Sequence, residues 1–149
     1  MHRSTHFMEL LDRSVRTPRI EAMSKFIEEN FRKVEPPTIV GIGLSGAIIA
    51  CQIATRIDCN LCLVRKFTTS HTLMSIEAEE DFTKYVIVDD QIATGETIRN
   101  IRTKLGTRKC LGIVLFNVGK ISCGYSHCGG INDVPVYWAD KDLRFTRYE

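Results

Sequence analysis

The sequence predicts an α/β domain with a mostly parallel central sheet flanked by helices. Three observations predict it: short apolar runs rich in β-branched residues, helical patterns between those runs, and turn residues where one pattern gives way to the next. Strands that alternate with helices are joined by crossovers and therefore run parallel. The length of 149 residues suits one domain, so we expect a single domain over 1–149 with its core at about 18–140.

The first half of the chain contains two predicted helices and two predicted strands. Apolar residues recur at helical spacing over 18–33, and the proline pair that follows enforces a stop. A β-branched run predicts a strand at 38–42. A glycine-containing turn at 43–46 leads into an apolar helix over 47–57, and a second strand is expected at 61–65.

The second half repeats the alternation. A buried strand is predicted at 85–89, followed by a polar turn and a helix from about 98 to 105. A fourth strand follows at 111–116. The short fifth strand at 134–138 is expected at an edge of the sheet, because Pro135 cannot donate to a hydrogen-bonded ladder.

Residues 67–84, between the second and third strands, show no clear period. Connections longer than about 12–15 residues without internal structure are usually lids or disordered segments. The tip of this stretch is polar, from Thr68 to His71, and its second half is acidic, from Glu77 to Asp81. We expect a flexible lid here, with a plain solvated loop as the alternative.

The strand at 85–89 ends in two adjacent carboxylates, Asp89 and Asp90. The following turn contains Thr94, Gly95 and Thr97, and a helix starts directly after it. Backbone N–H groups at a helix N-terminus carry partial positive charge and bind phosphate, and a glycine lets a ligand approach closely. Because carboxylates repel phosphate, the acidic pair suits ribose hydroxyls, a metal ion or a developing positive charge. The arrangement predicts a site for a sugar phosphate that reacts at its anomeric carbon.

The turn after the first strand reads Gly41-Ile-Gly43-Leu-Ser-Gly46, which satisfies the G-x-G-x-x-G pattern of dinucleotide-binding folds. That alternative requires an acidic residue at the end of the second strand for the ribose, and the chain has Arg65 and Lys66 there. Those cations would suit only a phosphorylated ribose. In the other interpretation the same turn binds a diphosphate, with the two cations beside it.

The segments 86–90 and 93–97 resemble the phosphoribosyl-pyrophosphate signature of the type I phosphoribosyltransferases. The resemblance extends over roughly 18–140, and adenine-type and other purine enzymes are the most similar members. It implies transfer of the phosphoribosyl group of phosphoribosyl pyrophosphate to a nitrogenous base, a purine being favoured, with release of pyrophosphate. The phosphoribosyl-pyrophosphate synthetases carry a similar signature, but this chain is too short for them.

The resemblance implies a role for each candidate residue. Asp89 and Asp90 would be the catalytic pair, holding the ribose hydroxyls and stabilising the positive charge on the sugar ring. The other candidates bind the phosphate groups of the donor. The 5′-phosphate would lie on Ala93, Thr94, Gly95, Glu96 and Thr97, and the pyrophosphate on Gly43, Leu44, Ser45, Gly46, Arg65 and Lys66.

The resemblance also implies a small hood that holds the base, a magnesium ion and a homodimer. Hood candidates are the segments 1–17 and 120–149, with Lys120, Trp138 and Asp140 as base-binding residues. For Trp138 a core position, and for Asp140 a turn cap, remain open alternatives. Mg²⁺ would bind mainly through the substrate, near Asp89 and Asp90, as this ion prefers oxygen ligands.

Composition limits the other function classes. The net charge of +2 is too small to indicate nucleic-acid binding, and the basic residues between Arg99 and Lys109 are interpreted as a solvated helix face. No apolar run is long enough to span a membrane and the first residues lack a signal-peptide core, which predicts a cytoplasmic protein. A non-catalytic module that senses phosphoribosyl pyrophosphate or a nucleotide is the main alternative from another class.

Six cysteines in such a chain are expected to be reduced thiols, with Cys51 and Cys110 in the core. Two groups have a spacing at which zinc is conceivable. They are Cys59 with Cys62, and Cys123 with His127 and Cys128. However, Cys62 lies inside the expected strand 61–65 and the two groups share no loop, which argues against a structural zinc site.

Overall fold

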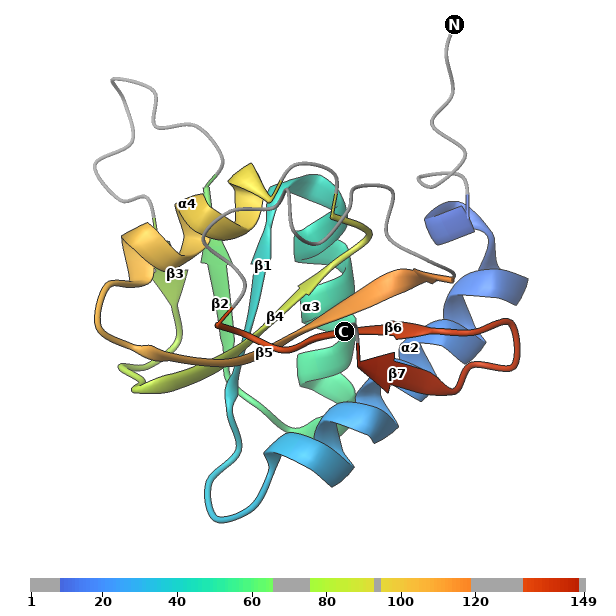
Figure 1. Ribbon diagram of the computed structural model, residues 1–149, viewed down its shortest axis with the longest axis horizontal. Coiled ribbons are helices and arrows are strands. Elements are labelled where there is room, and N and C mark those ends of the chain that lie inside the picture. Colours follow the sequence, from blue (N-terminus) through green and yellow to red (C-terminus); the bar gives the residue numbers. More distant parts are fainter. Residues whose placement is uncertain (1–8, 66–75, 93–94, 119–132, 148–149) are drawn as a thin grey trace, which may run out of the picture.

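The structure is a computed structural model of the chain, and it describes residues 9–65, 76–92, 95–118 and 133–147. Within these residues a seven-stranded sheet forms the centre, in the order β3-β2-β1-β4-β5-β6-β7 (Figure 1). The five inner strands run parallel, and the two edge strands β3 and β7 are antiparallel to their neighbours. This architecture confirms the predicted α/β fold class. The strands are β1 Thr38–Ile42, β2 Leu61–Val64, β3 Ile76–Ala78, β4 Lys84–Asp89, β5 Lys109–Val118, β6 Val136–Ala139 and β7 Phe145–Arg147, and the helices are α2 Arg13–Phe31, α3 Gly43–Ile57 and α4 Glu96–Leu105.

The helices divide between the two faces of the sheet. Alternate residues of β4 show this: Val86 and Val88 are buried in one apolar cluster with α2 and α3, while Tyr85 and Ile87 belong to a second cluster with α4. Side chains of a strand point alternately to opposite faces, so every inner strand contributes to both clusters. The sheet therefore forms the middle of three layers.

Two short edge strands were not predicted. Part of the expected lid is the strand β3, which pairs with β2 as an antiparallel hairpin. The strand β7 pairs with β6, so the expectation that β6 forms the edge was wrong. The proline does not prevent this, because Pro135 precedes β6 and contributes only its carbonyl, which accepts a 2.9 Å hydrogen bond from the Ile113 N–H.

Two helices begin earlier than predicted. The helix α2 begins at Arg13, because the carboxylate of Asp12 accepts a 2.9 Å hydrogen bond from the Ser14 N–H and caps the first turn. The helix α3 begins directly at Gly43, and no separate turn lies between it and β1. The predicted turn at 43–46 is therefore the first turn of α3.

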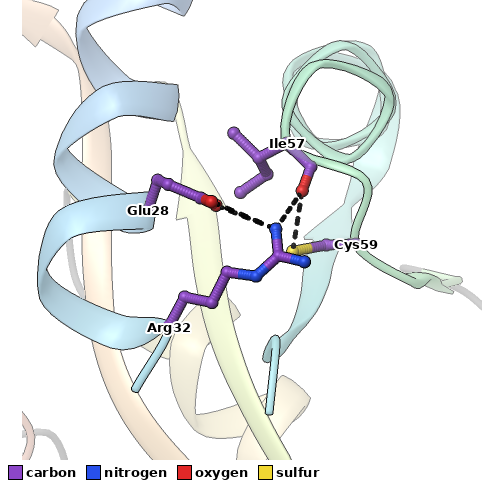
Figure 2. A network of polar contacts seen from close by, with 4 residues as sticks. All are labelled: Glu28, Arg32, Ile57 and Cys59. Atoms are coloured by element: carbon purple, nitrogen blue, oxygen red, sulfur yellow. Dashed lines mark hydrogen bonds and ion pairs between the residues drawn. The ribbon is translucent and has the colours of Figure 1, made fainter. Parts of the chain in front are cut away.

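The C-terminal ends of α2 and α3 are joined by a polar network (Figure 2). The guanidinium of Arg32, which follows α2, donates a 2.7 Å hydrogen bond to the carbonyl of Ile57, the last residue of α3. The same group pairs with Glu28 at 3.1 Å. The Cys59 thiol also lies against the Ile57 carbonyl, at 3.9 Å, and burial raises the pKa of Cys59 to about 11. This network holds the lower ends of the two helices together.

The cysteine spacing does not produce a shared metal site. Cys59 is buried in the cluster with α2 and α3, whereas Cys62 is buried on the opposite face of the sheet. Burial also raises the pKa of Cys62 to about 11, which disfavours the thiolate that zinc requires. The second group, Cys123 with His127 and Cys128, lies outside the described residues. Cys51 is exposed, so its predicted core position was wrong.

No helix within the part of the chain that the structure describes has the length and apolar character needed to cross a bilayer.

Candidate active site

The acidic pair lies where β4 ends, and its two carboxylates differ in exposure. Asp89 is only 7% exposed, and its carboxylate accepts a 2.8 Å hydrogen bond from the Asp90 N–H. Asp90 is partly exposed and accepts a 2.7 Å hydrogen bond from the Gln91 N–H. These backbone contacts fix both side chains at the carboxyl edge of the sheet. Of the two, only Asp90 is accessible to solvent to a substantial degree.

Gly95 provides the turn into α4. Its φ of 80° lies in the left-handed region that favours glycine, and its carbonyl accepts the first helical hydrogen bond, from the Arg99 N–H at 3.0 Å. Gly95, the N-cap residue, has no side chain that could cap the first turn of α4. The N-terminus of a helix carries partial positive charge and favours an anion. Thr97 is half-buried in this first turn and Glu96 is exposed, while Ala93 and Thr94 lie outside the described residues.

The other candidate phosphate loop is the first turn of α3. Gly43 has a φ of 71°, and no side chain caps this helix either. The turn is packed tightly on the sheet, because a Cβ on Gly41 would lie 2.2 Å from the Gly46 carbonyl oxygen. Leu44 in this turn is 67% exposed, and Ser45 is partly exposed. The glycine spacing therefore allows close packing of the first turn of α3 against β1.

The two helix N-termini lie at the same edge of the sheet. The strands β1 and β4 are parallel neighbours, paired from Thr38 with Tyr85 to Val40 with Ile87. α3 leaves the carboxyl end of β1 and α4 follows the carboxyl end of β4. In open α/β sheets, ligands bind outside the carboxyl ends of the strands, where neighbouring connections go to opposite faces.

The cation predicted beside the pyrophosphate has a protein partner. Arg65 follows β2, at the same edge of the sheet, and its guanidinium pairs with Glu77 of β3 at 2.8 Å. Both side chains are about half exposed, so the ion pair is weak and a phosphate group can compete for the guanidinium. The backbone carbonyl of Arg65 accepts a 2.7 Å hydrogen bond from Lys104, which ties α4 to this strand end. Lys66 lies outside the described residues.

The base-binding candidates have different surroundings. Trp138 is half-buried on β6, and the alternation from Val136 and Tyr137 places it on the face of the sheet that carries α4. Asp140 caps the hairpin between β6 and β7 by accepting hydrogen bonds from the Asp142 and Arg144 N–H groups, at 2.9 and 3.0 Å. These bonds lower the pKa of Asp140. Its alternative role as a turn cap is therefore observed. Lys120 lies outside the described residues.

Asn117 is a polar residue at this edge that was not singled out from the sequence. Its backbone N–H donates a 2.9 Å hydrogen bond to the Asp90 carbonyl, so it lies beside the acidic pair. Both polar atoms of its side chain are buried and have no hydrogen-bond partner among the described residues. Buried amides in native proteins are normally paired, so an unpaired one indicates a group that a ligand can satisfy. The signal in the sequence is a single polar residue that follows the apolar run 111–116.

The chain belongs to the phosphoribosyl transferase domain family, whose sequence profile matches residues 9–118. This match confirms the predicted resemblance, and it covers β1 to β5 with both helix N-termini and the acidic pair. Among curated protein sequences, none matches this chain significantly.

Solved structures of similar fold include adenine and orotate phosphoribosyltransferases. The adenine enzyme of Saccharomyces cerevisiae has a TM-score of 0.62 and 19% identity, over 80% of that chain and 87% of this one. The orotate enzyme of Francisella tularensis has a TM-score of 0.60 and 19% identity, over 62% of that chain and 80% of this one. The orotate enzyme of Aeropyrum pernix has a TM-score of 0.61 and 19% identity, over 64% of that chain and 76% of this one. This chain therefore spans less than two thirds of the length of the two orotate enzymes, and the likeness concerns the fold.

The topology does not favour the dinucleotide-binding alternative. That fold continues from its second strand through a helix to a third parallel strand. Here β2 is followed by the antiparallel strand β3.

Proposed function

We propose that this chain transfers the phosphoribosyl group of phosphoribosyl pyrophosphate to a nitrogenous base, a purine being the favoured acceptor, and releases pyrophosphate. The observation that carries the proposal is that two helix N-termini, neither capped by the side chain of its N-cap residue, and the pair Asp89–Asp90 meet at one edge of the sheet. One helix N-terminus suits each phosphate end of the donor, and the carboxylates suit the ribose between them.

The chemistry of the transfer fits these groups. The bond from the ribose C1 to the pyrophosphate oxygen breaks and its electron pair leaves with pyrophosphate. C1 forms a bond to a base nitrogen, and the proton that this nitrogen carried is released to solvent. Positive charge develops on the sugar ring as the first bond lengthens. The carboxylate of Asp89 is nearly buried, so its charge acts in a lower dielectric than water and stabilises this cation more strongly.

Mg²⁺ fits the site through the oxygen atoms of the donor. The described residues contain no group of three or more His, Cys, Asp or Glu side chains that could enclose a metal ion. Mg²⁺ usually binds one or two carboxylates together with substrate phosphates, and Asp89 and Asp90 provide that number. When bound, the ion neutralises charge on the departing pyrophosphate.

The acceptor base would lie beyond the acidic pair, along β5 and β6. Asn117 and Trp138 immediately precede Val118 and Ala139, which are paired across these two strands. Trp138 lies two strand spacings from β4, about 10 Å, which leaves room for a ring between the indole and the sugar. The indole offers a face for stacking and the Asn117 amide offers one donor and one acceptor group. Lys120 and Asp140 remain predictions for this subsite.

A sensing module that binds phosphoribosyl pyrophosphate without turnover is the second candidate. One observation favours it: Arg65, the cation expected beside the pyrophosphate, is already paired with Glu77. The expected homodimer remains a prediction for either function.

An assay with the whole chain separates the two functions. The protein is incubated with phosphoribosyl pyrophosphate, Mg²⁺ and a panel of purines and pyrimidines, and nucleotide is detected by mass. We expect one nucleotide and an equal amount of pyrophosphate. Thermal denaturation with the donor alone provides the second measurement, since a ligand at a hundredfold excess over its Kd stabilises the native state by about 2.7 kcal/mol. Stabilisation without product would support the sensing module. The absence of both stabilisation and product would contradict both candidates.

A further inference from the structure

A pocket lies at the amino end of the sheet, opposite the candidate active site. Its volume is about 630 Å³, which is within the usual range for small-molecule sites. It lies beside the end of α2 and the starts of β4 and β5. The residues that line it are Asn30, Phe31, Lys33, Val34, Glu35, Lys84, Lys109 and Leu111.

The pocket concentrates positive charge. It contains three lysines and one carboxylate, that of Glu35. Among the described residues every ion pair is made by an arginine, and Lys33, Lys84 and Lys109 have no ion pair or side-chain hydrogen bond. The three ammonium groups therefore make no ion pair, although the Glu35 carboxylate lines the same cavity.

Two of these lysines are held side by side by the sheet. Lys84 and Lys109 are in register as the first residues of the neighbouring parallel strands β4 and β5. Lys84 precedes Val86 by two positions, so its side chain lies on the same face as that of Val86, the face covered by α2 and α3. Lys109, its partner in the neighbouring strand, lies on this face too. Like charges on neighbouring strands repel. An anionic ligand would remove this repulsion.

The apolar part of the lining suits a ring. Phe31 and Leu111 are half-buried and pack against the cluster of α2 and α3, and Val34 is 95% exposed. A cavity with an apolar wall and unpaired ammonium groups matches a ligand that carries both a flat ring and phosphate groups.

We propose that this lysine pocket binds a nucleoside polyphosphate at a site separate from the candidate active site. The strand β4 runs from Lys84 in the pocket to Asp89 in the candidate active site, five residue steps or roughly 16 Å. The two sites therefore lie at opposite ends of the same strand, and binding in the pocket does not depend on the proposed transfer reaction.

The test is titration of the whole chain with adenosine triphosphate, in which calorimetry measures the affinity. The double variant Lys84→Gln and Lys109→Gln should lower the affinity about tenfold or more, because each lysine contributes a charge-assisted contact to phosphate. The control is Lys25→Gln, an exposed lysine of α2 that does not line the pocket, with an expected change below about twofold. Equal affinities in the double variant and the parent, or equal losses in both variants, would overturn the proposal.

Two further probes define the ligand class. Tripolyphosphate has the phosphate groups without the ring, so it should bind several-fold more weakly than adenosine triphosphate. Equal affinity would remove the role of the apolar wall and overturn the nucleoside assignment. An octaglutamate peptide that competes as strongly as adenosine triphosphate at the same lysines would show an acidic polypeptide site instead.

Stability without ligand distinguishes the pocket from a helix cap. Lysines near the C-terminus of α2 could simply favour the negative end of its dipole. In that case the double variant would unfold at a lower temperature than the parent, and the proposal would fail. Removal of two like charges that lie side by side should instead leave the melting temperature unchanged or slightly raised.

Discussion

At the scale of single residues, the candidate active site depends on two adjacent aspartates with different surroundings. Asp89 ends β4 and is nearly buried, while Asp90 begins the loop and is partly exposed. A charge acts more strongly in a low dielectric than in water. The two residues should therefore contribute unequally to the stabilisation of a positive sugar ring.

Replacement of each aspartate by asparagine tests this difference. Asp89→Asn keeps an oxygen that can accept the Asp90 N–H but removes the charge, and turnover should fall by about 10²–10³. Asp90→Asn should cost less, because its carboxylate is better solvated. Turnover is measured as nucleotide formed per unit time, and the melting temperature confirms folding. The matched control is Asp58→Asn. Asp58 is exposed and has a left-handed backbone conformation at the C-terminal end of α3.

Near-normal turnover in both aspartate variants would remove the pair from the catalytic role. A loss of similar size in Asp58→Asn would show that the effect comes from the fold.

Several site residues could be predicted from the sequence because their chemistry is local. A strand end, two carboxylates and a glycine at a helix start are neighbours along the chain, so spacing reveals them. Asn117 could not be found this way. Its importance comes from its place on β5 beside Asp90 and from the absence of a hydrogen-bond partner for its amide among the described residues. The pair of Arg65 and Glu77 escaped prediction for the same reason, since it requires the unexpected strand β3.

At the scale of elements, the contact between β1 and α3 sets the geometry of one phosphate-binding end. The helix begins directly at Gly43, and its first turn rests on the strand through Gly41 and Gly46. Two glycines facing each other let the backbones approach more closely than any pair with side chains.

These two glycines should respond oppositely to alanine. Gly41→Ala places a Cβ 2.2 Å from a backbone carbonyl, which no rotamer change can relieve, so unfolding free energy should fall by about 3 kcal/mol or more. Gly46→Ala meets atoms no closer than 3.5 Å and lies in a helix, so stability should be unchanged or about 1 kcal/mol higher. Urea denaturation measures both. Equal destabilisation would mean that α3 does not pack on β1 as described.

The longer elements were predictable, and the short edge strands were not. The helix α2 has apolar residues at helical spacing, and the inner strands are continuous apolar runs, which in β1 and β4 are buried on both faces. The strands β3 and β7 have three residues each and are largely exposed, with no apolar alternation to detect. Their existence depends on pairing with β2 and β6, which is a tertiary property.

At the scale of the whole molecule, the interior contains thiols on both faces of the sheet. Burial raises the pKa of Cys59, Cys62 and Cys110 to about 11, from an ordinary value of 9.0. Cys59 is buried on the face covered by α2 and α3, and Cys62 on the face covered by α4, so local opening of one helix would not expose both thiols. The native state as a whole therefore resists ionisation of these groups.

Stability should accordingly fall in alkaline solution between about pH 9 and pH 11. Above pH 9 thiols of the unfolded chain lose their protons, whereas those of the native state keep them until about pH 11. The native state then binds more protons than the unfolded state, so the free energy of unfolding decreases as pH rises. Urea denaturation under reducing conditions from pH 8 to 11 measures this slope. Cys62→Ala should make it shallower, since Cys62 is fully buried, whereas Cys51→Ala, at an exposed position, should keep the parental slope. If both variants decline as steeply as the parent, lysine and tyrosine ionisation accounts for the alkaline loss and the buried thiols do not.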